Sequence, residues 1–411
     1  MPGRGPNREH HDAPGEPAAP HKRRGEDRVR PARGAARQAD LLHHENAQGE
    51  GNNDWCPGSA VMERAAVIGG GVVGCHVAYA LARKGYETYL FERHERLGQE
   101  TSSRNSGVLH AGIYYKKYSL KAGLCVEGNA LSREFFRDHD VAFRETGKYI
   151  IARTDSEITE IERLRESAGE NGAPVEPATP SRVKRDLPYI ECVAALYSPS
   201  TAIVDAADYM DRMKAALYQA GVSVIAPCNV RGIRGNVCVT DRGEFLADLF
   251  VNSAGLYADE LAAECGLHGY VVRPLKGDYY STVSIECRVP VYPPPSVHTG
   301  TLGVHLTPTF GREVLLGPSE THTEAKDDYE IRTPREEFSS SLASMIDAAT
   351  AARIELNEGY SGNRPRVYLN GERCEDFVVV RRPSNVIHLL GIESPGLTAA
   401  PALARYVLSM L

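Results

Sequence analysis

Three glycines and one carboxylate are the residues of this chain whose types and spacing point to chemistry. Gly69, Gly71 and Gly74 give the spacing G-x-G-x-x-G, and Glu92 follows eighteen residues after the third glycine. In this pattern the first glycine makes a tight turn, the second lets the backbone approach a pyrophosphate, and the third lets a helix pack closely on a sheet. Glu92 is placed to accept hydrogen bonds from ribose hydroxyls. The pattern therefore predicts a dinucleotide site, although glycine turns also occur for purely steric reasons.

The segments around the glycines favour the dinucleotide interpretation. An apolar run at residues 66–68 precedes the turn, an amphipathic helical pattern follows it, and a second apolar run at 88–91 ends at Glu92. This order predicts a strand, a helix and a second strand. The N-terminus of such a helix offers unpaired N–H groups and a partial positive charge to phosphates. The acid disfavours a 2′-phosphorylated nucleotide, which leaves NAD and FAD as alternatives.

Composition narrows the class of protein. The 411 residues are 25% charged and 42% hydrophobic, with a net charge of −7, so the charge balance gives no reason to expect a nucleic-acid partner. The nine cysteines form no C-x-x-C pair, and no group of Cys and His has metal-ligand spacing. We therefore expect reduced thiols, no metal and a cytoplasmic protein. No apolar run is long enough to span a membrane, so we expect at most peripheral association with the inner membrane face.

Residues 1–61 differ from the rest of the chain. They are rich in Pro, Gly, Arg, His, Glu and Asp and show no helix or strand periodicity. They also lack the apolar core of a secretory signal, and their acidic residues argue against an organelle transit peptide. We expect either a disordered tail or a true start at Met62, with the folded protein beginning there in both cases.

The remaining pattern predicts an α/β (α+β) fold with two domains. Helices are expected at 119–138, 156–169, 204–221 and 333–357, and a last helix opens at 395–398. Residues 171–200 read as irregular, and 271–317 as rich in β-strands. We expect a Rossmann-like nucleotide domain from 62–147, 201–264 and 365–411. An inserted substrate domain with an antiparallel sheet would comprise 148–200 and 265–364.

Several segments taken together resemble a known family. They are 102–115 (SSRNSGVLHAGIYY), 119–122, 252–259, 277–280, 302–308, 316–318 and 391–398. The series is similar to FAD-dependent oxidoreductases of the D-amino-acid oxidase and glycine oxidase superfamily, and most similar to the L-2-hydroxyglutarate dehydrogenase/oxidase family. The resemblance extends from residue 62 to the C-terminus. One departure is Asn363, which stands before Arg364 where the family usually has an aliphatic residue.

The resemblance implies FAD as the cofactor, and it assigns many residues to binding it. We expect the cofactor-binding residues to be Gly69, Gly71, Gly74, Glu92, Arg93, Ser102, Ser103, Arg104, Asn105, Ser106, Gly107, Val230, Ala254, Gly255, Gly391, Gly396, Leu397 and Thr398. The last three stand at a helix start, which is suited to stabilising negative charge on a reduced flavin. The alternative for these three is a simple N-terminal turn.

The reaction that the resemblance implies is the oxidation of L-2-hydroxyglutarate to 2-oxoglutarate, by hydride transfer to flavin N5. It requires a carboxylate clamp, for which the resemblance indicates Arg364, and a base for the hydroxyl proton. His110 and His305 lie in family motifs and are the candidates for the base. The remaining residues that we expect to contact substrate are Tyr114, Lys276 and Tyr279.

Other functions stay open at this point. The electron acceptor would be oxygen, a quinone or an electron-transfer protein. The alternatives are an amine-type oxidase or a glycerol-3-phosphate dehydrogenase of the same superfamily, or a non-catalytic FAD-binding scaffold.

Overall fold

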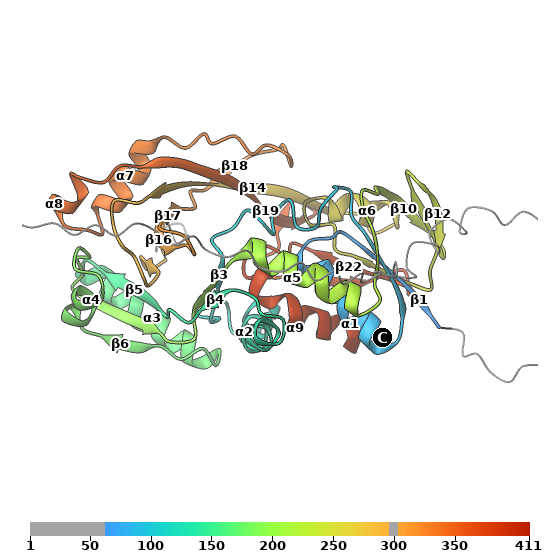
Figure 1. The fold of residues 1–411 in the computed structure, drawn as a ribbon, viewed down its shortest axis with the longest axis horizontal. Helices are drawn as coiled ribbons and strands as arrows, with labels where there is room; N and C mark the ends of the chain where they lie inside the picture. Colours follow the sequence, from blue (N-terminus) through green and yellow to red (C-terminus); the bar gives the residue numbers. More distant parts are fainter. Residues whose placement is uncertain (1–61, 296–302) are drawn as a thin grey trace, which may run out of the picture. The chain divides into compact units, whose positions relative to one another are not determined.

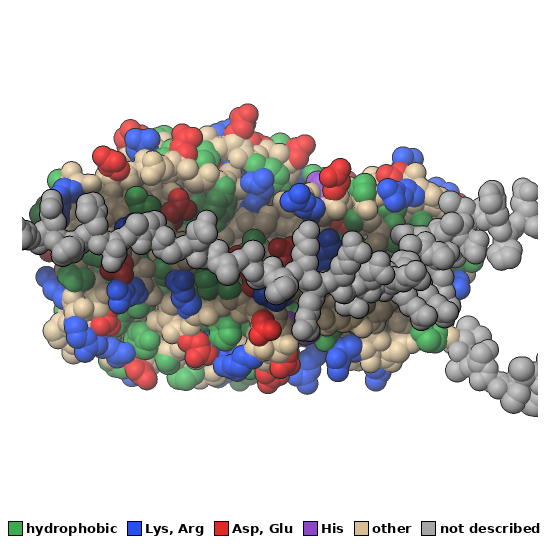
Figure 2. All heavy atoms as spheres, in the orientation of Figure 1, with side chains coloured by type: hydrophobic (Ala, Val, Ile, Leu, Met, Phe, Trp, Pro, Cys, Tyr) green, Lys and Arg blue, Asp and Glu red, His purple; other side chains and the backbone are tan. Residues whose placement is uncertain are grey.

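The computed structural model describes residues 62–295 and 303–411. The expectation for residues 1–61 therefore lies outside the described residues, as does Leu302 of the 302–308 motif. In the described part of the chain, no helix is long and apolar enough to cross a membrane. Figure 2 shows acidic and basic side chains interspersed over the visible face.

The first of the two principal sheets is mainly parallel and is called here the parallel sheet. Its strand order is β21-β22-β13-β1-β2-β9, with only the edge pair β21–β22 antiparallel. Its strands are β1 (Arg64–Ile68), β2 (Glu87–Phe91), β9 (Ser223–Ile225), β13 (Leu249–Asn252), β21 (Val378–Arg381) and β22 (Val386–Leu390). The inner strands β13 and β22 are buried along their whole length. Burial on both faces is typical of a parallel sheet covered on each side.

Different elements cover the two faces of the parallel sheet (Figure 1). One face packs on four helices, α1 (Val72–Lys84), α2 (Leu120–Asp138), α5 (Ala206–Gln219) and α9 (Gly396–Ser409). The other packs on α6 (Ala258–Glu264) and on an antiparallel sheet of β10 (Val230–Arg234), β11 (Val237–Thr240) and β12 (Gly243–Leu246). A short 3-10 helix, η2 (Gly255–Tyr257), precedes α6. Helix α2 approaches the start of α9 so closely that a Cβ at Gly128 would lie 2.3 Å from the Thr398 carbonyl oxygen.

The second principal sheet, called here the large sheet, has ten strands within the described residues. They are β5 (Lys148–Ala152), β6 (Glu176–Ala178), β7 (Ala194–Ser198), β14 (Tyr270–Thr282), β15 (Val291–Tyr292), β16 (His305–Pro308), β17 (Val314–Gly317), β18 (Thr321–His322), β19 (Asn357–Leu369) and β20 (Glu372–Arg373). The order is β20-β19-β14-β17-β16-β15-β5-β7-β6, with β18 also pairing with β14. Every pairing is antiparallel except that between β15 and β5. The long strands β14 and β19 form an extended ladder (Figure 1).

Short elements complete the fold around the large sheet. Helix α3 (Asp155–Glu170) packs on β5 and β7, and α4 (Pro180–Asp186), α7 (Arg335–Ala343) and α8 (Ala348–Ala351) lie beside the same sheet. A small sheet of β3 (Val108–Leu109), β8 (Ala202–Val204) and β4 (Phe143–Arg144) follows the order β3-β8-β4.

The fold class expected from the sequence is confirmed, as are the helices at α1, α2, α3, α5 and α9. Two expectations are wrong. Residues 171–200 are not irregular, because β7 pairs along its length with the buried strand β5 and brings β6 with it. Residues 333–357 are not one helix, because α7 ends at Ala343 and the next residues pair Ile346 with Ile190 before α8 begins. The two-domain division stays a prediction. The domain boundary predicted between residues 364 and 365 falls inside strand β19.

Candidate functional site

A cavity of about 1760 Å³ extends from the glycine turn after β1 to the strands β14, β16 and β19 of the large sheet. Ordinary small-molecule pockets measure roughly 300–1,000 Å³. The cavity therefore has room for a dinucleotide and a second, smaller molecule. Most residues predicted to bind a cofactor or a substrate line it.

The glycine turn shows which glycines the protein itself requires. Gly69 has a φ of +106°, and a Cβ there would lie 2.4 Å from the Ser253 carbonyl oxygen. A Cβ at Gly74 would lie 1.9 Å from the Gly69 carbonyl oxygen, so α1 could not pack where it does. Gly71 is different, because its backbone is extended (φ −71°) and its Cβ would meet only the Ser102 hydroxyl, at 3.1 Å. The structure thus leaves a cradle at Gly71 that a side chain would fill, as a bound pyrophosphate requires.

Glu92 is held in place by two backbone groups. Its Oε2 accepts from the Gly70 N–H at 2.7 Å, and its Oε1 accepts from the His94 N–H at 2.9 Å. The side chain is buried at the cavity wall. Each carboxylate oxygen keeps a lone pair for a further donor, so the group suits a ribose with two hydroxyls.

The polar loop after β2 is fixed largely by its own hydrogen bonds. The Ser102 hydroxyl accepts from the Val72 N–H at 2.9 Å, at the first turn of α1. The Asn105 amide donates to the Ser102 carbonyl and accepts from the Gly107 N–H. The Arg93 guanidinium lies 3.7 Å from the centre of the Tyr257 ring and pairs with Glu100. These contacts hold the loop along the cavity wall.

The structure divides the predicted cofactor residues into two sets. Thirteen line the cavity: Gly69, Gly71, Glu92, Arg93, Ser102, Arg104, Asn105, Ser106, Val230, Ala254, Gly255, Gly396 and Leu397. The other five are Gly74, Ser103, Gly107, Gly391 and Thr398, and they have structural contacts instead. A Cβ at Gly391, for example, would lie 2.3 Å from Val367 Cγ1, and the Thr398 hydroxyl accepts from the His110 N–H at 2.9 Å.

The predicted reactive residues lie together at the end of the cavity beside the large sheet, which is called here the reactive end. His110, His305, Arg364, Tyr114 and Tyr279 all line it. Three buried atoms of this group, His110 Nδ1, the Tyr114 hydroxyl and Arg364 Nη1, have no hydrogen-bond partner among the described residues. Buried polar atoms are nearly always hydrogen-bonded in proteins. This group is therefore suited to binding a polar ligand.

Both histidines are neutral at physiological pH. Loss of hydration lowers the pKa of His110 and of His305 to about 3, and the positive charge of Lys148 contributes to each shift. His305 Nδ1 lies 3.1 Å from the Gly303 carbonyl oxygen, which can only accept, so Nδ1 carries the proton and Nε2 keeps its lone pair. The His305 ring also stacks on Tyr292, with centroids 3.8 Å apart. A bound carboxylate would raise these pKa values and make the rings better bases.

Arg364 extends from β19 toward an acidic neighbour. Its Nη1 lies 3.5 Å from Glu320 Oε1, and both side chains are partly exposed in the cavity. Gly277 on the paired strand β14 leaves room for the guanidinium, because a Cβ there would lie 3.2 Å from Arg364 Nη2. Glu320 stands two residues after the 316–318 motif, which is a signal that could have identified it from the sequence.

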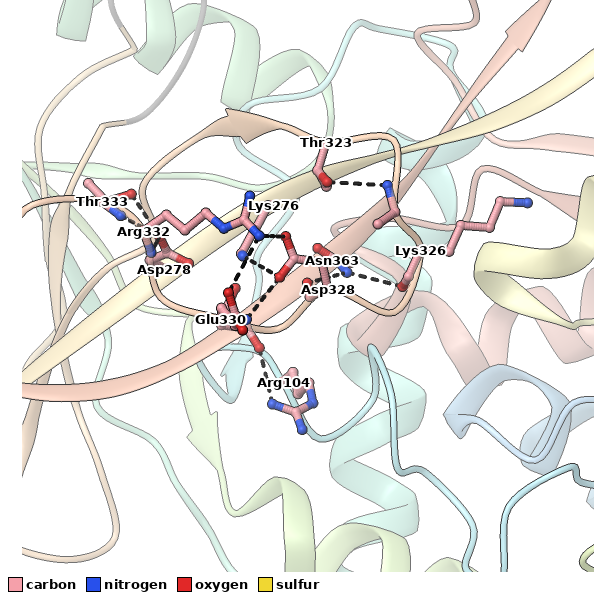
Figure 3. Close-up of polar contacts among 12 residues, drawn as sticks. Arg104, Lys276, Asp278, Thr323, Lys326, Asp328, Glu330, Arg332, Thr333 and Asn363 are labelled. Atoms are coloured by element: carbon pink, nitrogen blue, oxygen red, sulfur yellow. Dashed lines mark hydrogen bonds and ion pairs between the residues drawn. The ribbon is translucent and has the colours of Figure 1, made fainter.

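The expectation that Lys276 binds substrate is corrected. Lys276 pairs across the ladder with Asn363, whereas Arg364 pairs with Leu275. Because side chains alternate along a strand, Lys276 and Arg364 lie on opposite faces. Lys276 does not line the cavity, and its Nζ lies 3.0 Å from Asp328 Oδ1 (Figure 3).

Asn363 lies on the same face as Lys276, and its contacts there explain why an asparagine stands at this position. Its amide donates to the carbonyl oxygens of Lys326 and Asp328, at 3.1 and 3.0 Å (Figure 3). The segment that it anchors also carries Tyr329, whose ring centre lies 4.2 Å from the Arg104 guanidinium. Asn363 therefore fastens this segment beside a wall of the cavity, a role that an aliphatic residue could not fill.

Two further residues at the reactive end were missed. Tyr292 lines the cavity, and Lys148 lies buried against the rings of Tyr114 and Tyr292, with Nζ 4.5 Å from each centre. Both belong to short buried strands whose pattern gives no functional signal. In the described part of the chain, no group of three His, Cys, Asp or Glu side chains is arranged to hold a metal.

Comparisons with known proteins identify the family of the chain. The family model DAO, described as FAD dependent oxidoreductase, matches residues 64–410. The mitochondrial L-2-hydroxyglutarate dehydrogenase of Arabidopsis thaliana is 30% identical over 400 residues, covering 83% of this chain and 82% of that protein. The glycerol 3-phosphate dehydrogenase of Caloramator mitchellensis is 28% identical over 367 residues, covering 85% and 74%.

Solved structures share the fold. The FAD-bound L-alpha-glycerophosphate oxidase from Mycoplasma pneumoniae superposes with a TM-score of 0.76 at 23% identity, covering 85% of this chain and 94% of that one. The glycine oxidase from Geobacillus kaustophilus gives a TM-score of 0.72 at 21% identity, covering 85% and 94%.

Proposed function

Because the chain belongs to the FAD dependent oxidoreductase family, we propose that it oxidises a 2-hydroxy acid, with L-2-hydroxyglutarate as substrate and 2-oxoglutarate as product. One observation carries the proposal: a single cavity contains the dinucleotide cradle and the group of His110, His305 and Arg364. The relatives named L-2-hydroxyglutarate dehydrogenase support the choice of substrate.

The cofactor in this proposal is FAD, which the cradle at Gly71 and the fixed carboxylate of Glu92 fit. When bound, FAD supplies an acceptor for the hydride that leaves C2 of the substrate, at flavin N5. Helix α9 begins at Gly396, which lines the cavity, and it has no side-chain N-cap. The positive end of its dipole is therefore available to stabilise negative charge that develops on the reduced cofactor.

The protein's own residues bind the substrate and accept its proton. The Arg364 guanidinium presents two N–H groups to the C1 carboxylate, a geometry that fixes the position of the adjacent C2. The hydroxyl proton on C2 passes to a histidine as the hydride leaves, so that a carbonyl forms without a charged intermediate. His305 is the better placed acceptor of the two, since its hydrogen bond to Gly303 fixes a tautomer with Nε2 unprotonated.

Glycerol 3-phosphate is the second candidate substrate, and the relative from Caloramator mitchellensis favours it. Its phosphate could also bind Arg364, because guanidinium pairs with phosphate as with carboxylate. Amine oxidation and a non-catalytic FAD scaffold remain alternatives that no contact in the cavity favours over these two.

The experiment that tests the proposal is anaerobic bleaching of the bound flavin. We would mix the purified yellow protein with L-2-hydroxyglutarate, its D enantiomer, glycerol 3-phosphate or glycine, and follow the visible flavin band. The expected result is rapid bleaching by L-2-hydroxyglutarate alone. Bleaching by glycerol 3-phosphate or glycine instead would show that this compound is the substrate. No bleaching by any of the four would favour the non-catalytic scaffold. Reoxidation by air, a quinone or an electron-transfer protein would then identify the class of electron acceptor.

A further inference from the structure

We propose that Lys148 binds a second carboxylate of the substrate and thereby selects dicarboxylic over monocarboxylic hydroxy acids. This inference rests on the proposed function, because it assigns the C5 carboxylate of 2-hydroxyglutarate to Lys148 and the C1 carboxylate to Arg364. The alternative for a buried lysine is a structural ion pair.

The surroundings of Lys148 are unlike those of a structural ion pair. Its side chain is fully buried, at 0% exposure, and its Nζ has neither a hydrogen bond nor a carboxylate neighbour among the described residues. Instead, the ammonium lies against the faces of Tyr114 and Tyr292. A buried charge without a partner is costly unless a ligand compensates it. Burial accordingly lowers the pKa of Lys148 to about 7.

Lys148 does not itself line the cavity, but it lies directly behind two side chains that do. Both of its aromatic neighbours line the cavity, and Tyr292 stacks on His305. The Tyr114 hydroxyl is a further buried group without a partner, and it can donate to the same carboxylate as the ammonium. A carboxylate that reaches Nζ past these two rings would thus satisfy two groups that have no hydrogen-bond partner among the described residues.

The two cations of this end act on the same imidazole. The charges of Lys148 and Arg364 both lower the pKa of His305, which places that ring within electrostatic reach of each. A substrate with a carboxylate at each end can pair with both cations while it presents its hydroxyl to His305. A monocarboxylic acid would leave one cation buried and unpaired.

Binding of unreactive acids to the FAD-loaded protein tests this inference. Glutarate and pentanoate have five carbons each, but only glutarate has two carboxylates, and perturbation of the flavin spectrum reports their Kd values. We expect glutarate to bind wild type about ten-fold or more tightly than pentanoate, and Lys148→Met to remove most of this difference while pentanoate binding stays unchanged. Lys148→Arg, which retains the charge, should retain part of the preference.

Lys276→Met is the matched control, because Lys276 is equally buried but lies on the opposite face of β14, paired with Asp328. It should lower thermal stability and leave the ratio of the two Kd values unchanged. If Lys148→Met fails to retain flavin, Lys148→Gln takes its place in the same titration.

Two results would overturn the inference: equal binding of the two acids by wild type, or an equal loss of both in the Lys148 variant. The proposed function fails separately. If glutarate preference depends on Lys148 but L-2-hydroxyglutarate does not bleach the flavin, the second carboxylate site stands and the substrate assignment is wrong.

Discussion

At the scale of single residues, the two histidines of the cavity give the most direct test of catalysis. General-base assistance typically contributes ~10²–10⁴-fold in rate. We expect His305→Ala to lower the limiting rate of flavin reduction by such a factor, and His110→Ala to do so if it shares the role, with FAD still bound. Stopped-flow reduction by L-2-hydroxyglutarate measures this rate.

The control for this series is His322→Ala, since His322 is exposed on β18 and outside the cavity. It should reduce flavin at the wild-type rate. Wild-type limiting rates in both cavity variants would show that neither histidine is the base.

Substitutions of Arg364 and of Glu320 are expected to change substrate binding in opposite directions. Removing the guanidinium in Arg364→Ala loses a charge-assisted pair of about 1.5–3 kcal/mol, so KM should rise by roughly 10–100-fold. Glu320→Gln should lower KM instead, because the Glu320 carboxylate lies 3.5 Å from Arg364 and competes with that of the substrate. Steady-state kinetics with L-2-hydroxyglutarate measures both, and an unchanged KM in Arg364→Ala would rule out the clamp.

The sequence identified only part of this residue group. His110, His305, Arg364, Tyr114 and Tyr279 were found because they lie in recognisable motifs, and the structure brings all five to one cavity. Lys276 was wrongly included because the sequence does not show which face of β14 meets the cavity. Lys148 was missed for the complementary reason, since a lysine in a buried strand gives no signal until its neighbours on other strands are known.

At the scale of elements, the start of α1 separates two roles of glycine. Gly71→Val adds a side chain to an extended residue that contacts little within the protein, so the variant should fold and fail to retain FAD. Gly74→Ala should instead destabilise the fold, because its Cβ would overlap the Gly69 carbonyl. Flavin absorbance per protein and circular dichroism distinguish the two results. A Gly71→Val protein with full flavin content would contradict the pyrophosphate cradle.

Elements with long periodic patterns were predictable, and those that depend on distant partners were not. The first strand, helix and strand follow from local spacing, and so do α2, α5 and α9. Strand β7 is short, and it is stabilised by its register with β5, more than forty residues away in the chain. The same holds for the order of the large sheet, which brings β15 beside β5 in parallel. Local periodicity contains no information about such pairings.

At the scale of the whole molecule, buried neutral histidines make stability depend on pH. Desolvation lowers the pKa of His76, His110 and His305 to about 3, against about 6.5 in an unfolded chain. Between these values the unfolded chain binds protons that the folded chain does not, so stability falls as the pH falls below about 6.5. Burial alone would raise the pKa of Glu393, but Lys121 and Arg366 lower it. Protonation of such paired carboxylates reduces stability further only below about pH 4.5.

Urea unfolding with saturating FAD should therefore show a lower free energy of unfolding at pH 5.5 than at pH 7.5. His305→Gln, which removes one of these titrating rings, should reduce the difference. Equal or greater stability at the lower pH would show that these rings are not kept neutral in the folded protein.

The order of strands in the parallel sheet has a consequence for biosynthesis. Strand β22 pairs with β13 inside the sheet, and α9 supplies Gly396 to the cavity and packs on α1 and α2. Both elements follow every other described element, whereas β1 and the glycine turn are synthesised much earlier. A nascent chain that stops before β22 leaves one edge of β13 unpaired, and a chain that stops before α9 lacks part of the cavity wall. We therefore expect stable loading with cofactor only after α9 has been synthesised, so that retained flavin marks chains translated through α9.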